Sequence, residues 1–265
     1  MRVSMIQLAV EASESADERR RRAAAAVRSR AGDDLVVLPE LWTAGAWAYD
    51  RWDQDAEPLD GPTAEAMSAA ARHAGTWLHA GSIVERDTDG TLYNTALLFD
   101  RDGNPRGHYR KIHRYGFDTG EATLMGGGHD IVTVPADFGV IGLAVCYDLR
   151  FPELFRGLLD AGAELIAVPA AWPAARLSHW RLLTRTRALE EQVFLTACCA
   201  TGEHGGMEQG GHSTVVDPWG EVLAEAGRDE QVVTADADMA EVLRIRSALP
   251  VLRDRVLGVA PAAGR

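Results

Sequence analysis

Residues 141–156, IGLAVCYDLRFPELFR, decide both how this chain folds and where its chemistry lies. A predicted strand, apolar and rich in β-branched residues, ends at Cys146, and a predicted helix begins at Pro152. A cysteine at such a sharp strand-to-helix turn stands clear of the backbone, and the amide N–H groups after it point toward any bound group. The segment therefore predicts a nucleophilic thiol, with a buried structural cysteine as the alternative.

The composition predicts one soluble, globular domain without a nucleic-acid or membrane partner. The chain has 265 residues, of which 46% are hydrophobic and 25% charged, and its net charge is −12. The basic block Arg19–Arg22 lies in a predicted helix, and we interpret it as a solvated helix face. The N-terminal apolar run is too short for a signal peptide, and no stretch of about 20 apolar residues could span a membrane. Three cysteines, two of them adjacent, make no disulfide framework, which predicts a reducing, cytoplasmic location.

Strand and helix patterns alternate along the chain with no linker between them, so we predict a single domain over residues 1–258 and a C-terminal tail, 259–265. Several strands are joined by tight turns, such as DTDG at 87–90, which argues against a purely parallel sheet. Two mixed β-sheets, covered by helices on their outer faces, fit better. The glycine-rich pieces 126–128 and 205–211 are predicted loops. The predicted helices are 14–31, 63–75, 152–162, 178–192 and 238–248.

Three reactive side chains lie at the ends of separate predicted strands: Glu40, Lys111 and Cys146. A carboxylate can take the thiol proton and later activate water, and an ammonium can lower the thiol pKa and stabilise a tetrahedral oxyanion. The thiolate can then attack a carbonyl or nitrile carbon and form a covalent intermediate. The alternatives are a helix cap for Glu40 and a surface cation for Lys111.

Five segments carry a resemblance to a known family. PELW around Glu40, YRKIH around Lys111 and CYDLRFPELFR from Cys146 resemble the nitrilase, or carbon–nitrogen hydrolase, superfamily. RALEEQVFLTACCATG at 187–202 and GGHSTVVDPWGEVLAEAG at 210–227 also resemble segments of that family. All five stand in the family's chain order, and the resemblance runs from about residue 1 to residue 258.

The resemblance implies a four-layer αββα sandwich that associates into a homodimer. It implies that Glu40 is the base, Lys111 the oxyanion stabiliser and Cys146 the nucleophile. It also implies that the backbone amide of Tyr147 completes the oxyanion hole. Many members carry a second glutamate in the loop after the lysine, and Glu121 matches that position, where it would orient Lys111; an exposed loop acid is the alternative.

Other reactive residues receive weaker interpretations. His113 flanks Lys111 and could touch the pocket, although a surface role is favoured. Arg150 is mainly structural, with substrate contact as the alternative, and Trp172 is expected either at the pocket wall or in an interface. Cys198 and Cys199 are expected to pack in the core. No cluster has metal-ligand spacing, so we expect neither a metal nor an organic cofactor.

The resemblance is nearest to the omega-amidases, which release ammonia from small dicarboxylic monoamides. The segments 41–52, LWTAGAWAYDRW, and 114–128, RYGFDTGEATLMGGG, depart from that branch, and both are expected to line the pocket. The expected activity is therefore hydrolysis of a small, possibly omega-amide, substrate through a thioester. Within the family, the alternatives are hydrolysis of an N-carbamoyl amine or amino acid and, after that, hydrolysis of a nitrile. A non-enzymatic alternative is an interaction module that keeps this fold without catalysis.

Overall fold

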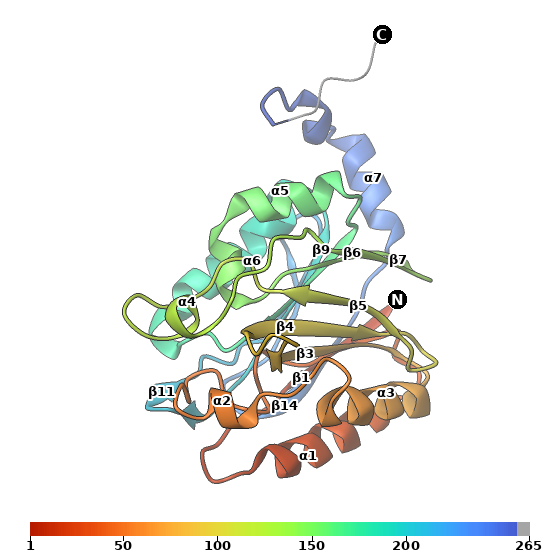
Figure 1. The fold of residues 1–265 in the computed structure, drawn as a ribbon. Helices are drawn as coiled ribbons and strands as arrows, with labels where there is room; N and C mark the ends of the chain where they lie inside the picture. The colour runs from red at the N-terminus through yellow and green to blue at the C-terminus, as the bar shows by residue number, and fades with distance from the viewer. Residues whose placement is uncertain (259–265) are drawn as a thin grey trace.

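Two six-stranded β-sheets form the centre of the computed structural model, which describes residues 1–258; the predicted tail lies outside the described residues (Figure 1). The first sheet has, in spatial order, β14 (Gln231–Asp236), β1 (Arg2–Gln7), β2 (Leu35–Val37), β3 (Trp77–Arg86), β4 (Leu92–Phe99) and β5 (Pro105–Arg110). The second has β13 (Val222–Glu225), β12 (Thr214–Val216), β9 (Phe194–Cys199), β8 (Leu165–Ala170), β7 (Gly139–Leu143) and β6 (Thr133–Ala136). Parallel and antiparallel neighbours occur in both, so the prediction of mixed sheets is confirmed.

Helices cover the outer face of each sheet. Helices α1 (Ala16–Arg28) and α3 (Pro62–Ala74) lie on the first sheet, and α5 (Pro152–Asp160) and α6 (Leu177–Glu191) on the second (Figure 1). The remaining helical segments are α2 (Trp52–Asp55), α4 (Glu121–Leu124) and α7 (Ala240–Ala248), with 3₁₀ turns η1 (Cys146–Arg150), η2 (Ala174–Arg176) and η3 (Val251–Asp254). Within residues 1–258, no helix combines the length and apolar character needed to cross a membrane.

The side chains of β1 point alternately to the two faces of the first sheet, and this shows how the layers are held together. Met5 packs into the large core between the two sheets, whereas its neighbour Ile6 packs against α1 and α3. Successive strand residues point to opposite faces, so one strand contributes both to the core between the sheets and to the layer under the helices. The order helix, sheet, sheet, helix is the predicted αββα sandwich, which the structure confirms.

Two details of the sequence prediction are wrong. The segment 205–211 is not wholly a loop, because β11 (Met207–Glu208) pairs with β10 (Glu203–His204) in a short hairpin. Arg19 is not solvated: it is buried, and its guanidinium donates to the carbonyl oxygens of Thr43, Glu11 and Glu14. Those carbonyls belong to loops outside the sheets, and the arginine supplies donors that no strand offers them.

A glycine positions the chain segment that carries Glu40. Gly81 interrupts the pairing of β3 at a bulge between His79 and Ser82, with φ +69°. A Cβ at Gly81 would lie 1.9 Å from the carbonyl oxygen of Pro39, the residue before Glu40. The close approach of the two backbones therefore requires glycine, both for the conformation and for the space.

We predict that Gly81→Ala destabilises the protein far more than Gly75→Ala does. Gly75 ends α3 with a similar φ of +66°, but a Cβ there meets nothing within 4 Å. Gly75→Ala should cost about 1 kcal/mol from backbone strain, and Gly81→Ala about 3 kcal/mol or more because the steric clash adds to the strain. Urea denaturation measures both; equal losses would show that Pro39 moves freely.

Candidate active site

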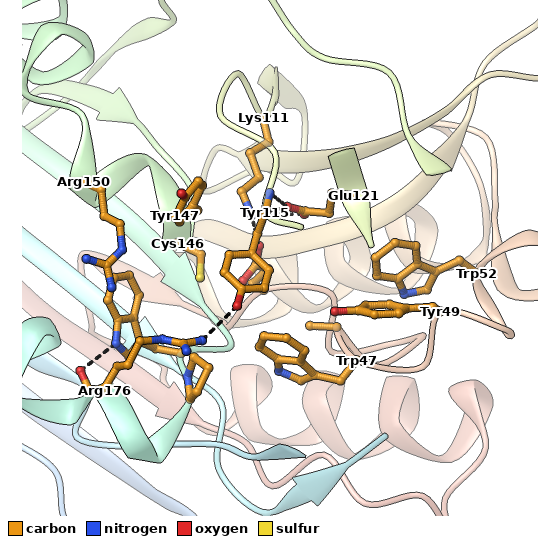
Figure 2. A pocket seen from close by; sticks show the side chains of 14 residues that line it. Trp47, Tyr49, Trp52, Lys111, Tyr115, Glu121, Cys146, Tyr147, Arg150 and Arg176 are labelled. Atoms are coloured by element: carbon orange, nitrogen blue, oxygen red, sulfur yellow. Dashed lines mark hydrogen bonds and ion pairs between the residues drawn. The ribbon is translucent and has the colours of Figure 1, made fainter. Parts of the chain in front are cut away.

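One pocket collects seven of the eight predicted site residues (Figure 2). They come from loops and turns at the ends of β2, β5, β7 and β8, where the two sheets present their strand ends to the same opening. These residues are Glu40, Lys111, Glu121, Cys146, Tyr147, Arg150 and Trp172. His113 is not among the residues that line the pocket; it stacks on Phe151 at 3.7 Å between ring centroids.

The ammonium group of Lys111 lies between two carboxylates. Its Nζ atom is 2.7 Å from Glu40 Oε1, and 3.0 and 2.7 Å from the two oxygens of Glu121. All three side chains are buried. Burial alone would lower the pKa of Lys111, but the charges of Glu121 and Glu40 outweigh it and raise that pKa well above its usual value. The side chain is therefore a fixed positive charge and not a base.

Asn94 of β4 ties the same two carboxylates together. Its Nδ2 atom donates to Glu40 Oε1 at 2.8 Å and also to Glu121 Oε1. Sequence reasoning missed this residue, because an asparagine inside a strand carries no catalytic signature. The one available signal was the polar pair Asn94-Thr95 at the start of the buried run NTALLF, 94–99.

The second oxygen of each carboxylate has different surroundings. Glu121 Oε2 accepts hydrogen bonds from Lys111 Nζ and from the backbone amide of Tyr115, the latter at 2.7 Å. Glu40 Oε2 accepts one from the amide of Ala171 at 2.9 Å. The negative charge of Glu40 also acts on the Cys146 thiol, whose pKa it raises. The two acids are thus chemically distinct, since Glu40 faces the sulfur and Glu121 faces the lysine.

Asp148 holds the turn that presents Cys146. Cys146 has φ +46°, a strained value for a side chain with a Cβ, and it begins η1 three residues after β7 ends. Asp148 Oδ2 accepts from Val145 N at 2.8 Å and from the Tyr109 hydroxyl at 2.9 Å. Its Oδ1 accepts from His113 N at 3.1 Å and lies 2.7 Å from His113 Nδ1. This buried carboxylate joins the cysteine turn to the chain segment that carries Lys111.

The thiol of Cys146 is held in its neutral form. Burial and the charge of Glu40 raise its pKa well above the usual value, while Lys111 acts in the opposite direction and is outweighed. The expectation that the ammonium lowers the thiol pKa therefore describes only one contribution. A thiol that stays protonated must lose its proton to a neighbouring base as it attacks.

Aromatic rings form the opposite wall of the pocket. Trp47, Tyr49 and Trp52 come from the segment 41–52, and Tyr115 comes from the segment 114–128, so the expectation that both segments line the pocket is confirmed. Tyr115 makes edge contacts with Trp47 and Tyr147, at ring-centroid distances of 5.5 and 5.3 Å. These contacts join the aromatic wall to the turn that carries Cys146.

Two arginines line the side of the pocket away from Trp52 (Figure 2). Arg150 lies over the ring of Trp172 at 4.9 Å, and its Nη2 is 3.2 Å from His179 Nδ1. Arg176 donates to the Tyr115 hydroxyl at 3.1 Å. Sequence reasoning missed Arg176, although its position four residues after Trp172, just beyond a buried strand, was an available signal.

The other two cysteines do not line this pocket. Cys198 and Cys199 are fully buried in β9, as expected for core residues. Among residues 1–258, no group of three or more histidine, cysteine, aspartate or glutamate side chains is arranged to hold a metal ion.

Comparison with known proteins identifies the family. The carbon–nitrogen hydrolase family model matches residues 2–247. The chain belongs to the carbon–nitrogen hydrolase family. It is 37% identical to a 2-oxoglutaramate amidase of Paenarthrobacter nicotinovorans over 99% of this chain and 92% of that protein. It is 34% identical to the human omega-amidase NIT2, over 96% of this chain and 94% of that protein.

A solved structure supports the same assignment. XC1258 of Xanthomonas campestris, a superfamily protein with an arsenic adduct in its active site, superposes with a TM-score of 0.89 at 30% identity. The match covers 100% of this chain and 99% of that one. This carbon–nitrogen hydrolase therefore has the nitrilase fold over its described length.

We predict opposite shifts of the Cys146 thiol pKa in two variants. Glu40→Gln removes a negative charge and should lower that pKa, so thiolate appears at lower pH; Lys111→Met removes the opposing positive charge and should raise it. Ultraviolet titration of the thiolate measures both shifts, with the corresponding Cys146→Ser double variants subtracted to remove Cys198 and Cys199. Shifts of the same sign would mean that neither charge acts directly on the sulfur.

Proposed function

We propose that this carbon–nitrogen hydrolase cleaves the amide of a small omega-amide substrate through a thioester on Cys146. The observation that carries the proposal is that the Cys146 thiol, the Glu40 carboxylate and its ion partner Lys111 are all buried and line the same pocket. This arrangement combines a nucleophile, a base and an electrostatic stabiliser at one end of the pocket.

Acylation begins with the thiol proton. Glu40 takes that proton as the sulfur attacks the amide carbon, and the carbonyl oxygen gains a negative charge. Lys111 Nζ and the backbone amide of Tyr147 stabilise this oxyanion. When the intermediate collapses, the C–N bond breaks and Glu40 returns its proton to the nitrogen, so that ammonia leaves and a thioester remains.

Deacylation uses the same base. Glu40 removes a proton from water as the water oxygen attacks the thioester carbon, and collapse of this second intermediate breaks the C–S bond. The thiolate regains a proton from Glu40, and a carboxylic acid is released. Glu121 remains bound to Lys111 throughout and orients its ammonium group, so it acts as a positioning residue.

The distribution of charged side chains in the pocket favours a substrate that carries a carboxylate at the end remote from its amide. Glu40, Glu121 and Lys111 together leave one net negative charge at the catalytic end, which repels an anion there. Arg150 and Arg176 lie on another side of the same pocket and offer guanidinium groups suited to a carboxylate. The relatives named 2-oxoglutaramate amidase and omega-amidase agree with this substrate class.

We also propose that the enzyme works as a homodimer in the cytoplasm. Large apolar side chains are exposed on α6 and the β12–β13 turn, among them Leu182, Leu189 and Trp219. Such a group of exposed apolar side chains favours contact with a second copy. Sedimentation velocity measures the oligomeric state directly.

We predict that Cys146→Ala abolishes turnover while the protein stays folded. With the wild-type enzyme, rapid quenching during turnover should trap an added acyl mass on the peptide that contains Cys146. Cys198→Ala, which removes a buried thiol outside the pocket, is the matched control and should retain activity. More than a few per cent of activity in Cys146→Ala would contradict the thioester mechanism.

A second prediction concerns the remote carboxylate. Arg176→Met should raise KM for an omega-amide acid by about 10- to 100-fold, the effect of losing a charge-assisted hydrogen bond, and should change KM little for an uncharged amide of equal length. Tyr115→Phe is the control, because it removes the hydrogen bond to Arg176 but keeps the guanidinium. An equal rise in KM for charged and uncharged amides would show that Arg176 does not bind the substrate carboxylate.

A comparison of substrates tests the class itself. Faster ammonia release from carbamoyl compounds or nitriles than from omega-amides would favour the alternative substrate classes.

A further inference from the structure

Asn94 lies behind the catalytic carboxylates and is not among the residues that line the pocket. It belongs to β4, is 2% exposed, and points its amide nitrogen at both acids. An amide nitrogen carries two hydrogens, so each can serve one carboxylate. Asn94 is thus a neutral donor shared between two negative charges.

Two buried carboxylates this close together oppose each other's ionisation. Burial raises the pKa of Glu121, and the charge of Glu40 adds to that effect. The charge of Lys111 and the hydrogen bonds from Lys111 and Asn94 act in the opposite direction. One ammonium must therefore offset two carboxylates, and Asn94 assists it without adding a charge that would compete for the substrate.

A count of hydrogen bonds distinguishes the two acids. A carboxylate has about four acceptor sites, two on each oxygen. All four of Glu121 are used, by Lys111 twice, by Asn94 and by the Tyr115 amide. Glu40 Oε1 is used twice, by Lys111 and Asn94, and Oε2 once, by the Ala171 amide. The remaining site is on Glu40 Oε2.

We propose that Asn94 is a positioning residue that keeps both carboxylates ionised and reserves Glu40 Oε2 for the proton of Cys146. By filling one site on Glu40 Oε1 and one on Glu121 Oε1, it directs proton transfer to a single oxygen of a single acid. The inference rests on the proposed function, in which Glu40 is the base.

The neighbouring titratable groups do not titrate at acidic pH, so they do not obscure the effect of Asn94 on the pH dependence of kcat/KM. The groups that face the two acids are Lys111 after β5, Cys146 in η1, Cys199 on β9 and Tyr49 in the segment 41–52. Burial raises the pKa of Cys199 to about 12, and burial also raises the pKa of Tyr49. Since Lys111 and Cys146 also keep their protons, they do not contribute to the acidic limb of the kcat/KM profile.

The experiment compares Asn94→Leu and Asn94→Asp with the control Thr95→Val. Leucine has a similar size but no donor, so protonation of the pair becomes easier. We expect kcat/KM to fall by about 10- to 100-fold, mostly through kcat, and the acidic limb to move up by about one pH unit. Asn94→Asp, which replaces both donors with a third acid, should be inactive. Thr95 is the next residue on β4, is equally buried and bonds Glu85, so Thr95→Val should lower stability without moving the limb.

The outcomes separate this inference from the proposed function. A wild-type acidic limb in folded Asn94→Leu would overturn the role of Asn94, while an inactive Cys146→Ala would leave the thioester mechanism intact. An active Cys146→Ala would instead overturn the proposed function. If Asn94→Leu does not fold, Asn94→Ala provides the test: its smaller side chain leaves space for a water donor, so its limb should shift in the same direction by a smaller amount. An unshifted limb in Asn94→Ala would also reject the proposal.

Discussion

The ion cluster of Lys111 with Glu40 and Glu121 is the interaction on which the site depends. A buried ammonium is costly unless it is paired, and a buried carboxylate is equally costly. Here the three side chains satisfy one another at distances of 2.7 to 3.0 Å. Because two acids share one cation, the cluster places a carboxylate beside Cys146, and this is the arrangement on which the proposed thioester mechanism depends.

The cluster can exist only because separate strand ends converge. Because Gly81 has no side chain, the segment before Glu40 can approach β3 closely. Asp148 joins the Cys146 turn to the segment after β5. The strained φ of Cys146 is maintained by those hydrogen bonds. The αββα layers thus support a strained turn, while the segments 41–52 and 114–128 line the pocket and supply its aromatic wall.

Prediction from sequence succeeded where a short motif and a local pattern agreed. Glu40, Lys111 and Cys146 each follow a predicted strand, and each lies in the pocket. It failed for residues whose role comes from a distant partner. Arg19 was interpreted as solvated because its helix carries four consecutive arginines, yet its guanidinium donates to carbonyls of two separate loops, one before its helix and one after β2. Its burial depends on how α1 packs, which helical periodicity does not specify.

The sequence by itself determined the family and the mixed-sheet architecture, and it predicted three side chains that share one pocket, because strand periodicity, tight turns and strand-end motifs are local properties. Only the tertiary structure decided that Asn94 bridges two acids, that the thiol stays protonated and that Arg176 faces the same pocket as Arg150. These features depend on distances between groups and on the exclusion of water. Both quantities arise only when strands remote in the chain pack together.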